Sequence, residues 1–122
     1  MRERVQREGQ IKPTRYYSSK QETAVAKAVN GKKTLNSGAT PFSKGDVLAA
    51  KVLLECKTKT SDSESMAIKK EWLEKNEKEA LFMGKPYNAL AFNFGPGQKN
   101  YYVIDEYMFQ LLLEAINNSV DF

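Results

Sequence analysis

The chain has 122 residues, and 41% of them are hydrophobic, which suits one domain built around a single core. Histidine is absent, so Ser-His-Asp triads, Cys-His pairs and histidine zinc sites are excluded. The one cysteine cannot form an internal disulfide, and a cytoplasmic location is expected. No apolar run reaches the ~20 residues that span a bilayer, and the charged N-terminus does not resemble a secretory leader. The net charge of +4 weakly favours an anionic partner, and no membrane partner is expected.

The first 18 residues are predicted to form a flexible basic arm ahead of a single domain over residues 19–122. The arm contains five basic residues, two glutamates and few apolar residues. Two interpretations stay open, a solubilising tail or an arm that follows a phosphate backbone. The basic residues are Arg2, Arg4, Arg7, Lys12 and Arg15.

The first helix is predicted over residues 19–30. Ser19 and Glu22 have the spacing of a capping box, which would give the glutamate a purely structural role. Glu22 also shares a helix face with Val25 and Val29, at spacing i, i+3, i+7, so it is expected to point along the apolar stripe. A carboxylate in that position needs a partner.

A short strand is predicted over residues 34–37, and a hydrophobic run with three charged residues follows it. Unpaired charges are costly in such strand-like sequence, and here they are Asp46, Glu55 and Lys57. Asp46 and Glu55 are nine residues apart, so one straight strand would place them ~30 Å apart on opposite faces. Either the two acids are unrelated, or the chain folds back around residues 49–51. No Gly, Asn or Asp marks a turn there.

A long polar helix is predicted over residues 62–83. Ser61 and Glu64 have the spacing of a second capping box, and Gly84 is expected to end the helix. Lysines and glutamates alternate along most of its length, which is typical of a solvated face with i,i+4 pairs.

Two strands, over residues 87–94 and 101–104, are predicted to form a hairpin. The glycine-rich segment that joins them is not followed by a helix, so it is interpreted as a turn and not as a phosphate-binding loop. An apolar helix is predicted to begin near Asp105, where it either packs on the sheet or supplies a subunit interface. The fold class is therefore α/β, with a central mixed sheet flanked by helices in the order αβββαββα.

Four polar residues in core-like sequence indicate the chemistry, and they are Glu22, Asp46, Glu55 and Lys57. Carboxylates without histidine suit Mg²⁺, or Mn²⁺ in its place, better than zinc. Such an ion supports phosphodiester hydrolysis by binding the attacking water and neutralising developing charge, and a nearby lysine orients or deprotonates that water. Cys56 is interpreted as a small buried hydrophobe and not as a nucleophile.

An aspartate, an eight-residue gap and a Glu-x-Lys triplet resemble the PD-(D/E)-x-K nuclease signature, and here these residues are Asp46, Glu55 and Lys57. The likeness is closest to the archaeal-type Holliday junction resolvases. It extends to Glu22 on the first helix and to Ser37 in a Ser-Gly element before the aspartate.

The resemblance covers roughly residues 19–94, and it departs from the family at Gly45, where the usual residue is proline, and in the short hairpin between the acids. It implies a restriction-endonuclease-like core and a magnesium-dependent endonuclease. It also implies a homodimer that cuts a four-way DNA junction at two symmetric positions. The small size would suit a phage-encoded enzyme acting in the host cytoplasm.

The same resemblance implies roles for individual residues. Asp46, Glu55 and Glu22 would bind the metal ion, and Lys57 would act on the attacking water. Ser37 would contact phosphate or order the site. Further DNA contacts are expected at three basic residues, Arg15, Lys59 and Lys69.

Other interpretations stay open. The runner-up among enzymes is another PD-(D/E)-x-K nuclease, such as a nickase or a repair or restriction-type enzyme. A different class is a small nucleic-acid-binding protein without catalysis, in which Glu55 and Lys57 form buried ion pairs. A third is a dimerisation module.

Overall fold

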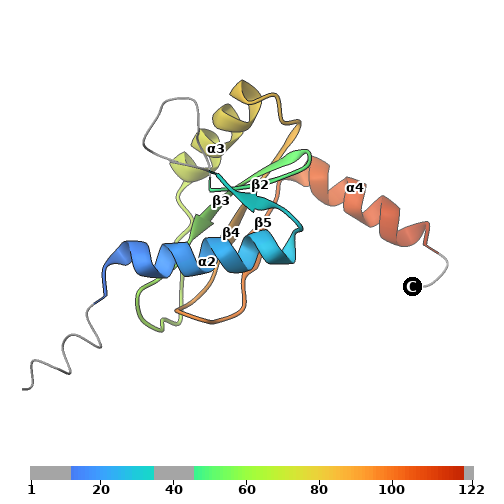
Figure 1. The fold of residues 1–122 in the computed structure, drawn as a ribbon. Helices are drawn as coiled ribbons and strands as arrows, with labels where there is room; N and C mark the ends of the chain where they lie inside the picture. The colour runs from blue at the N-terminus through green and yellow to red at the C-terminus, as the bar shows by residue number, and fades with distance from the viewer. Residues whose placement is uncertain (1–11, 35–45, 120–122) are drawn as a thin grey trace, which may run out of the picture.

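The computed structural model describes residues 12–34 and 46–119. This part of the chain is α/β, with a five-stranded mixed sheet flanked by helices (Figure 1). Its elements are α2 (Thr14–Ala28), β1 (Lys32–Lys33), β2 (Val47–Ala49), β3 (Val52–Lys57), α3 (Lys70–Phe82), β4 (Tyr87–Phe92), β5 (Tyr101–Val103) and α4 (Glu106–Asn117).

The strands lie in the order β1-β2-β3-β4-β5. Strands β3 and β4 are parallel, and the other neighbouring pairs are antiparallel. A parallel pair requires a crossover, and α3 provides it between β3 and β4. Helix α2 packs on β1, β2 and β3, whereas α3 packs on β3 and β4. The two helices cover opposite faces of the sheet (Figure 1).

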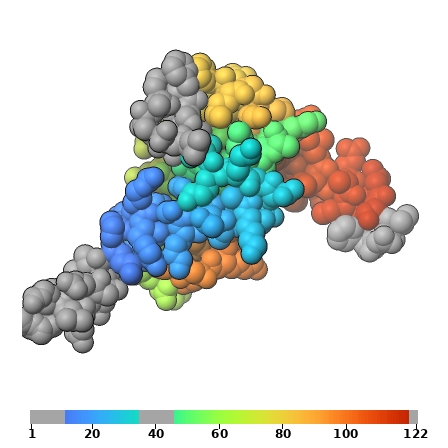
Figure 2. Space-filling model, in the orientation of Figure 1, coloured from blue at the N-terminus to red at the C-terminus, as the bar shows by residue number. Residues whose placement is uncertain are grey.

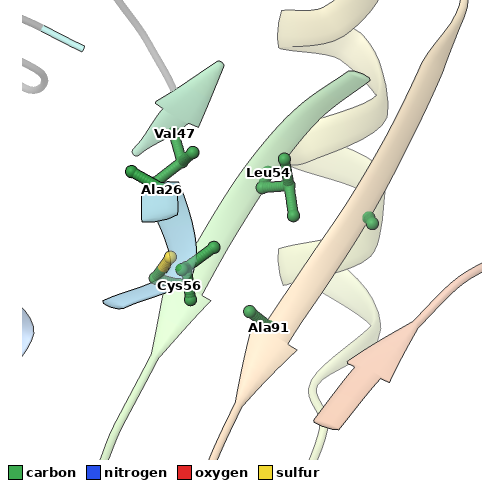
Figure 3. Close-up of a cluster of buried hydrophobic side chains, with 7 residues drawn as sticks. Ala26, Val47, Leu54, Cys56 and Ala91 are labelled. Atoms are coloured by element: carbon green, nitrogen blue, oxygen red, sulfur yellow. The ribbon is translucent and has the colours of Figure 1, made fainter. Parts of the chain in front are cut away.

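The hydrophobic core lies between α2 and the sheet (Figure 3). Alternation along β3 turns Leu54 and Cys56 toward this core, so Leu53, Glu55 and Lys57 point to the face that α3 covers. Cys56 is buried, as predicted. The core cluster consists of Val25, Ala26, Val47, Leu54, Cys56, Ala89 and Ala91.

Helix α2 begins at Thr14, five residues before the predicted start. Its N-cap is Pro13, with no side-chain cap, and Ser19 lies inside the helix, so the predicted capping box of Ser19 and Glu22 is wrong. Proline fixes φ near its helix-compatible value, and the start is set there. The helix ends where Asn30 adopts φ 57°, and a Cβ on the following Gly31 would lie 2.7 Å from the Leu48 carbonyl oxygen of β2.

Helix α3 begins at Lys70, eight residues later than predicted, and the capping box of Ser61 and Glu64 is wrong. In this segment Ser63 makes one distant and one local hydrogen bond instead of starting a helix. Ser63 donates its N–H to the Phe94 carbonyl at 2.8 Å, and its hydroxyl donates to the Ser65 carbonyl at 2.9 Å. The predicted end at Gly84 is confirmed, with φ 72° at that residue.

The predicted hairpin of β4 and β5 is confirmed, and so is the helix that follows it. Asp105 caps α4 by accepting the Met108 N–H at 2.9 Å. No residue of α4 is buried, so the helix does not pack on the sheet, and it stands out from the rest of the molecule (Figure 2). The strand predicted over residues 34–37 lies almost wholly outside the described residues.

Candidate active site

The β2–β3 hairpin brings Asp46 next to Glu55. Val47 lies opposite Leu54 in the antiparallel ladder, and Asp46 is one position further along. Its N–H donates to the Leu54 carbonyl at 2.9 Å, and its Oδ2 accepts the Cys56 N–H at 2.8 Å. The chain therefore folds back at residues 50–51, as the spacing of the two acids predicted.

Lys57 is held on two sides. Its Nζ lies 3.4 Å from Glu55 Oε2 and 4.5 Å from the centre of the Trp72 ring on α3. The Glu55 side chain is 13% exposed, so this ion pair is shielded from solvent far more than a surface pair. The pair and the ring together fix the ammonium group at the carboxyl end of β3.

Glu22 approaches the same place from α2. Burial, followed by the charge of Asp46, raises the pKa of Glu22 from 4.5 to about 6. Lys33 and Arg15 lower that pKa in part, and Glu55 raises it further. Burial is the largest of these effects, which agrees with the prediction that this glutamate points along the apolar stripe of the helix.

Asp46 and Glu55 are perturbed in the same direction. Burial raises the pKa of Asp46, while the Cys56 N–H and Lys57 act against that rise. Burial and then the Asp46 charge raise the pKa of Glu55, and Lys57 lowers it. Burial is thus the main cause of all three raised pKa values, and repulsion among these carboxylates adds to it at Glu22 and Glu55.

The donor set can be compared with the needs of a metal ion. Across residues 12–34 and 46–119, no three His, Cys, Asp or Glu side chains are grouped closely enough to hold an ion by themselves. Magnesium commonly binds through one or two carboxylates and completes its shell with water and substrate phosphate. Asp46 and Glu55 fit that requirement as a pair, and Glu22 is the neighbouring third carboxylate.

The other predicted site residues lie in different surroundings. Arg15 is exposed in the first turn of α2 and influences Glu22. Lys69 is exposed with its Nζ 5.7 Å from the Trp72 ring centre, whereas Lys59 donates to the Ser63 hydroxyl at 3.2 Å. Ser37 lies outside the described residues.

Three residues at the site were not predicted as part of it. Trp72 has no role in the sequence analysis, and Lys75 belongs to the lysine–glutamate face that is interpreted there as solvated. Lys75 lies 3.6 Å from Glu79 and lowers the pKa of both Asp46 and Glu55. Lys33 donates to the Ser19 hydroxyl at 3.0 Å and lowers the pKa of Glu22. The i,i+4 spacing of Lys75 and Glu79 predicts their pair, but sequence spacing gives no signal for the approach of these residues to the acids, because it joins separate elements.

Gln21 is a further residue that sequence reasoning did not identify. It is 4% exposed, and its amide nitrogen donates to the Lys57 carbonyl at 2.8 Å and to Asn100 Oδ1 at 3.1 Å. Asn93, also buried, donates to the same Asn100 oxygen at 3.2 Å. These amides connect α2 to the ends of β3 and β4. The available signal was the i, i+4 spacing of Gln21 and Val25 on the buried stripe of α2.

A hollow of about 140 Å³ lies beside this amide network. The aromatic ring of Tyr17 and the ammonium group of Lys20 line it from α2, and Pro96 and Gln98 line it from the loop between β4 and β5. Its lining therefore combines an aromatic residue, a lysine and polar amides next to the end of β3.

In the described part of the chain, no helix is long and apolar enough to cross a membrane. Comparison with protein-family models, curated proteins and solved structures gives no significant match.

Proposed function

We propose that this chain is a magnesium-dependent endodeoxyribonuclease with a restriction-endonuclease-like core, and that its substrate is a four-way DNA junction cut by a homodimer. The observation that carries the proposal is the meeting of Asp46, Glu55 and Lys57 across one hairpin, with Glu22 beside them. The choice of junction substrate comes from the resemblance of these residues to the resolvase signature.

Each of these residues has its own role in the proposed reaction. Asp46 and Glu55 would hold magnesium, or manganese in its place, and the ion would supply a bound water and neutralise charge on the phosphate. Lys57 is positioned to orient that water and to stabilise negative charge that develops on the phosphate oxygens. Glu22 adds negative charge that favours cation binding.

DNA binding is supported by the basic and aromatic residues around the acids. Arg15 and Lys33 lie near Glu22, and Lys69 flanks Trp72. Phosphate contacts of this kind give affinity without sequence preference, as recognition of a branched DNA requires. The hollow beside Tyr17 and Lys20 offers a stacking surface and a cation for a strand that leaves the site.

A second candidate is a nucleic-acid-binding protein without catalysis, and one observation favours it. The Glu55 carboxylate already has a cationic partner in Lys57 at 3.4 Å, although that interpretation expected both residues to pair with cross-strand neighbours. This pairing alone does not account for the raised pKa of Glu22, Asp46 and Glu55 together.

The test offers purified protein a four-way junction, a duplex, a flap and single strands, with and without magnesium. The nuclease proposal expects metal-dependent cleavage, with the junction cut fastest. In a Glu55→Gln variant, cleavage should be lost while junction binding is largely kept. The matched control is Glu77→Gln, which changes an exposed carboxylate on α3. Wild-type protein that binds but never cleaves, with magnesium or manganese, would establish the binding-only alternative, and preference for another DNA would overturn the resolvase assignment.

A further inference from the structure

Helix α4 is apolar around most of its circumference. Its polar side chains follow one stripe at spacing i, i+4, i+8, i+11, and they are Glu106, Gln110, Glu114 and Asn117. The remaining positions are Tyr107, Met108, Phe109, Leu111, Leu112, Leu113, Ala115 and Ile116. A helix with so narrow a polar stripe is normally buried against other elements.

This burial is missing in the single chain. Met108, Leu111 and Leu112 lean toward Tyr87 at the start of β4, where the four residues line a shallow apolar hollow. Phe109 and Leu113 form a neighbouring apolar stripe of the helix, and this stripe is open to solvent. Their side chains are 53% and 40% exposed. Such a surface on a basic, largely polar chain marks an interaction site.

A second apolar patch lies at the same end of the sheet. Leu81, in the last turn of α3, is 78% exposed. The chain runs from there through Gly84 to the start of β4, where α4 leans on Tyr87. Lys85 donates to the Ala50 carbonyl of the β2–β3 turn at 3.1 Å, which places that turn at this end as well.

The two patches carry opposite charges. The segment from Asp105 to Asn117 contains three acidic residues and no lysine or arginine. Around Leu81 lysines outnumber acidic residues: Lys78 and Glu77 lie one helical turn before it, Lys85 lies four residues after it, and the β2–β3 turn that Lys85 contacts carries Lys51. Apolar centres with complementary rims fit each other, whereas the acids of α4 would repel an anionic lipid surface.

We propose that α4 of one chain packs on the α3 end of a second copy, and that the reciprocal contact closes a two-fold dimer. Because both patches lie at one end of the sheet, a single two-fold axis can satisfy both contacts and close the assembly at two chains. The contact lies away from the carboxyl end of β3, so each copy keeps its carboxylates accessible. The use of this dimer for paired strand cleavage rests on the proposed function, but the surface itself does not.

The mass of the full-length protein in solution, measured by light scattering without DNA or metal, tests the surface. Wild type should be a dimer. Phe109→Glu combined with Leu113→Glu should weaken association by about 30-fold or more, and Leu81→Glu should do the same. All three side chains are exposed in the single chain, so folding should be unchanged by circular dichroism. The control is Gln110→Glu on the polar stripe, which should remain dimeric.

Exchanging the charges of two residues tests whether α4 of one chain contacts the α3 end of the other. Glu114→Lys and Lys78→Glu should each weaken the dimer, and the two changes combined in one chain should restore it. A monomeric wild type, assemblies larger than a dimer, or a combined variant no better than either single one would overturn the proposal. An inactive dimer would contradict the nuclease function alone. An active monomer would contradict this surface and the homodimer of the proposed function, and would leave the nuclease activity standing.

Discussion

The candidate active site and helix α4 break the usual distribution of side chains in opposite ways. At the site, carboxylates and a lysine are withdrawn from solvent among strands, and each has a counter-charge or hydrogen-bond donor nearby. On α4, leucines and aromatic residues are left in solvent without a covering element. Buried charge and exposed apolar surface both cost stability in an isolated chain. We propose a different partner for each, a cation at the site and a protein surface at α4.

The largest effect is expected from Lys57→Met at the site. This change keeps an apolar contact with Trp72 but removes the cation beside Glu55. If Lys57 assists proton transfer or stabilises phosphate charge, single-turnover cleavage should fall by about 10²–10⁴-fold. The control is Lys70→Met, which changes an exposed lysine on α3. Equal rates for both variants would remove Lys57 from the chemistry.

Gln21→Leu should affect the fold more than any polar substitution on α4. The variant removes the Gln21 donor from the Lys57 carbonyl and one of the two side-chain donors from Asn100 Oδ1. The free energy of unfolding in urea should fall by about 1–3 kcal/mol. Lys20→Leu, at the neighbouring exposed position, should change it by less than about 0.5 kcal/mol. If the two variants are equally stable, the amide network does not hold α2 to the sheet.

Glu22→Gln should stabilise the metal-free protein, and the effect should depend on pH. An acid whose pKa is higher in the folded state binds its proton more tightly there, so ionisation weakens the fold as the pH rises from 4.5 to about 6. Above this window the variant should exceed wild type by up to about 1 kcal/mol, since partial exposure screens the repulsion. Below it the two should be equal. Urea unfolding on either side of the window checks this, and a variant less stable above pH 6 would show that Glu22 has a favourable partner.

The smallest effect is expected for the ion pair of Lys70 and Glu74, 3.7 Å apart on the exposed side of α3. Removing either charge should change the free energy of unfolding by less than about 0.5 kcal/mol. A chemical denaturation series can measure this. A larger loss would mean that the charged face of α3 has a partner other than water.

The hairpin was predictable from the sequence although its turn has no turn residue. Two buried charges nine residues apart could belong to one site only if the chain folded back between them. In the structure, the residue pairs of the β2–β3 ladder fix the register of this hairpin, so residues 50–51 need not favour a turn. The start of α4 was predictable because Asp105 is a true cap. Here local sequence and tertiary structure favour the same conformation.

The starts of α2 and α3 were not predictable in the same way. Ser19 and Ser61 both have capping spacing, yet the first lies inside a helix and the second in a loop. Ser63 is held by the Phe94 carbonyl, a contact 31 residues away along the chain that no local pattern encodes. The same holds at the site, where Trp72 meets Lys57 only after α3 has crossed the sheet. Helix propensity is a weak guide to where a helix begins when contacts between distant parts of the chain determine its start.

The central claim is that the acids joined by the β2–β3 hairpin form a metal-dependent nuclease site. Its most direct test is cleavage of a four-way junction under single-turnover conditions while magnesium is titrated, for wild type, Asp46→Asn and the control Glu77→Gln. We predict saturable, magnesium-dependent cleavage in wild type and control, and a loss of at least about 10²-fold in Asp46→Asn with junction binding retained. Cleavage in Asp46→Asn at the wild-type rate, or none in wild type at any magnesium concentration, would contradict the claim.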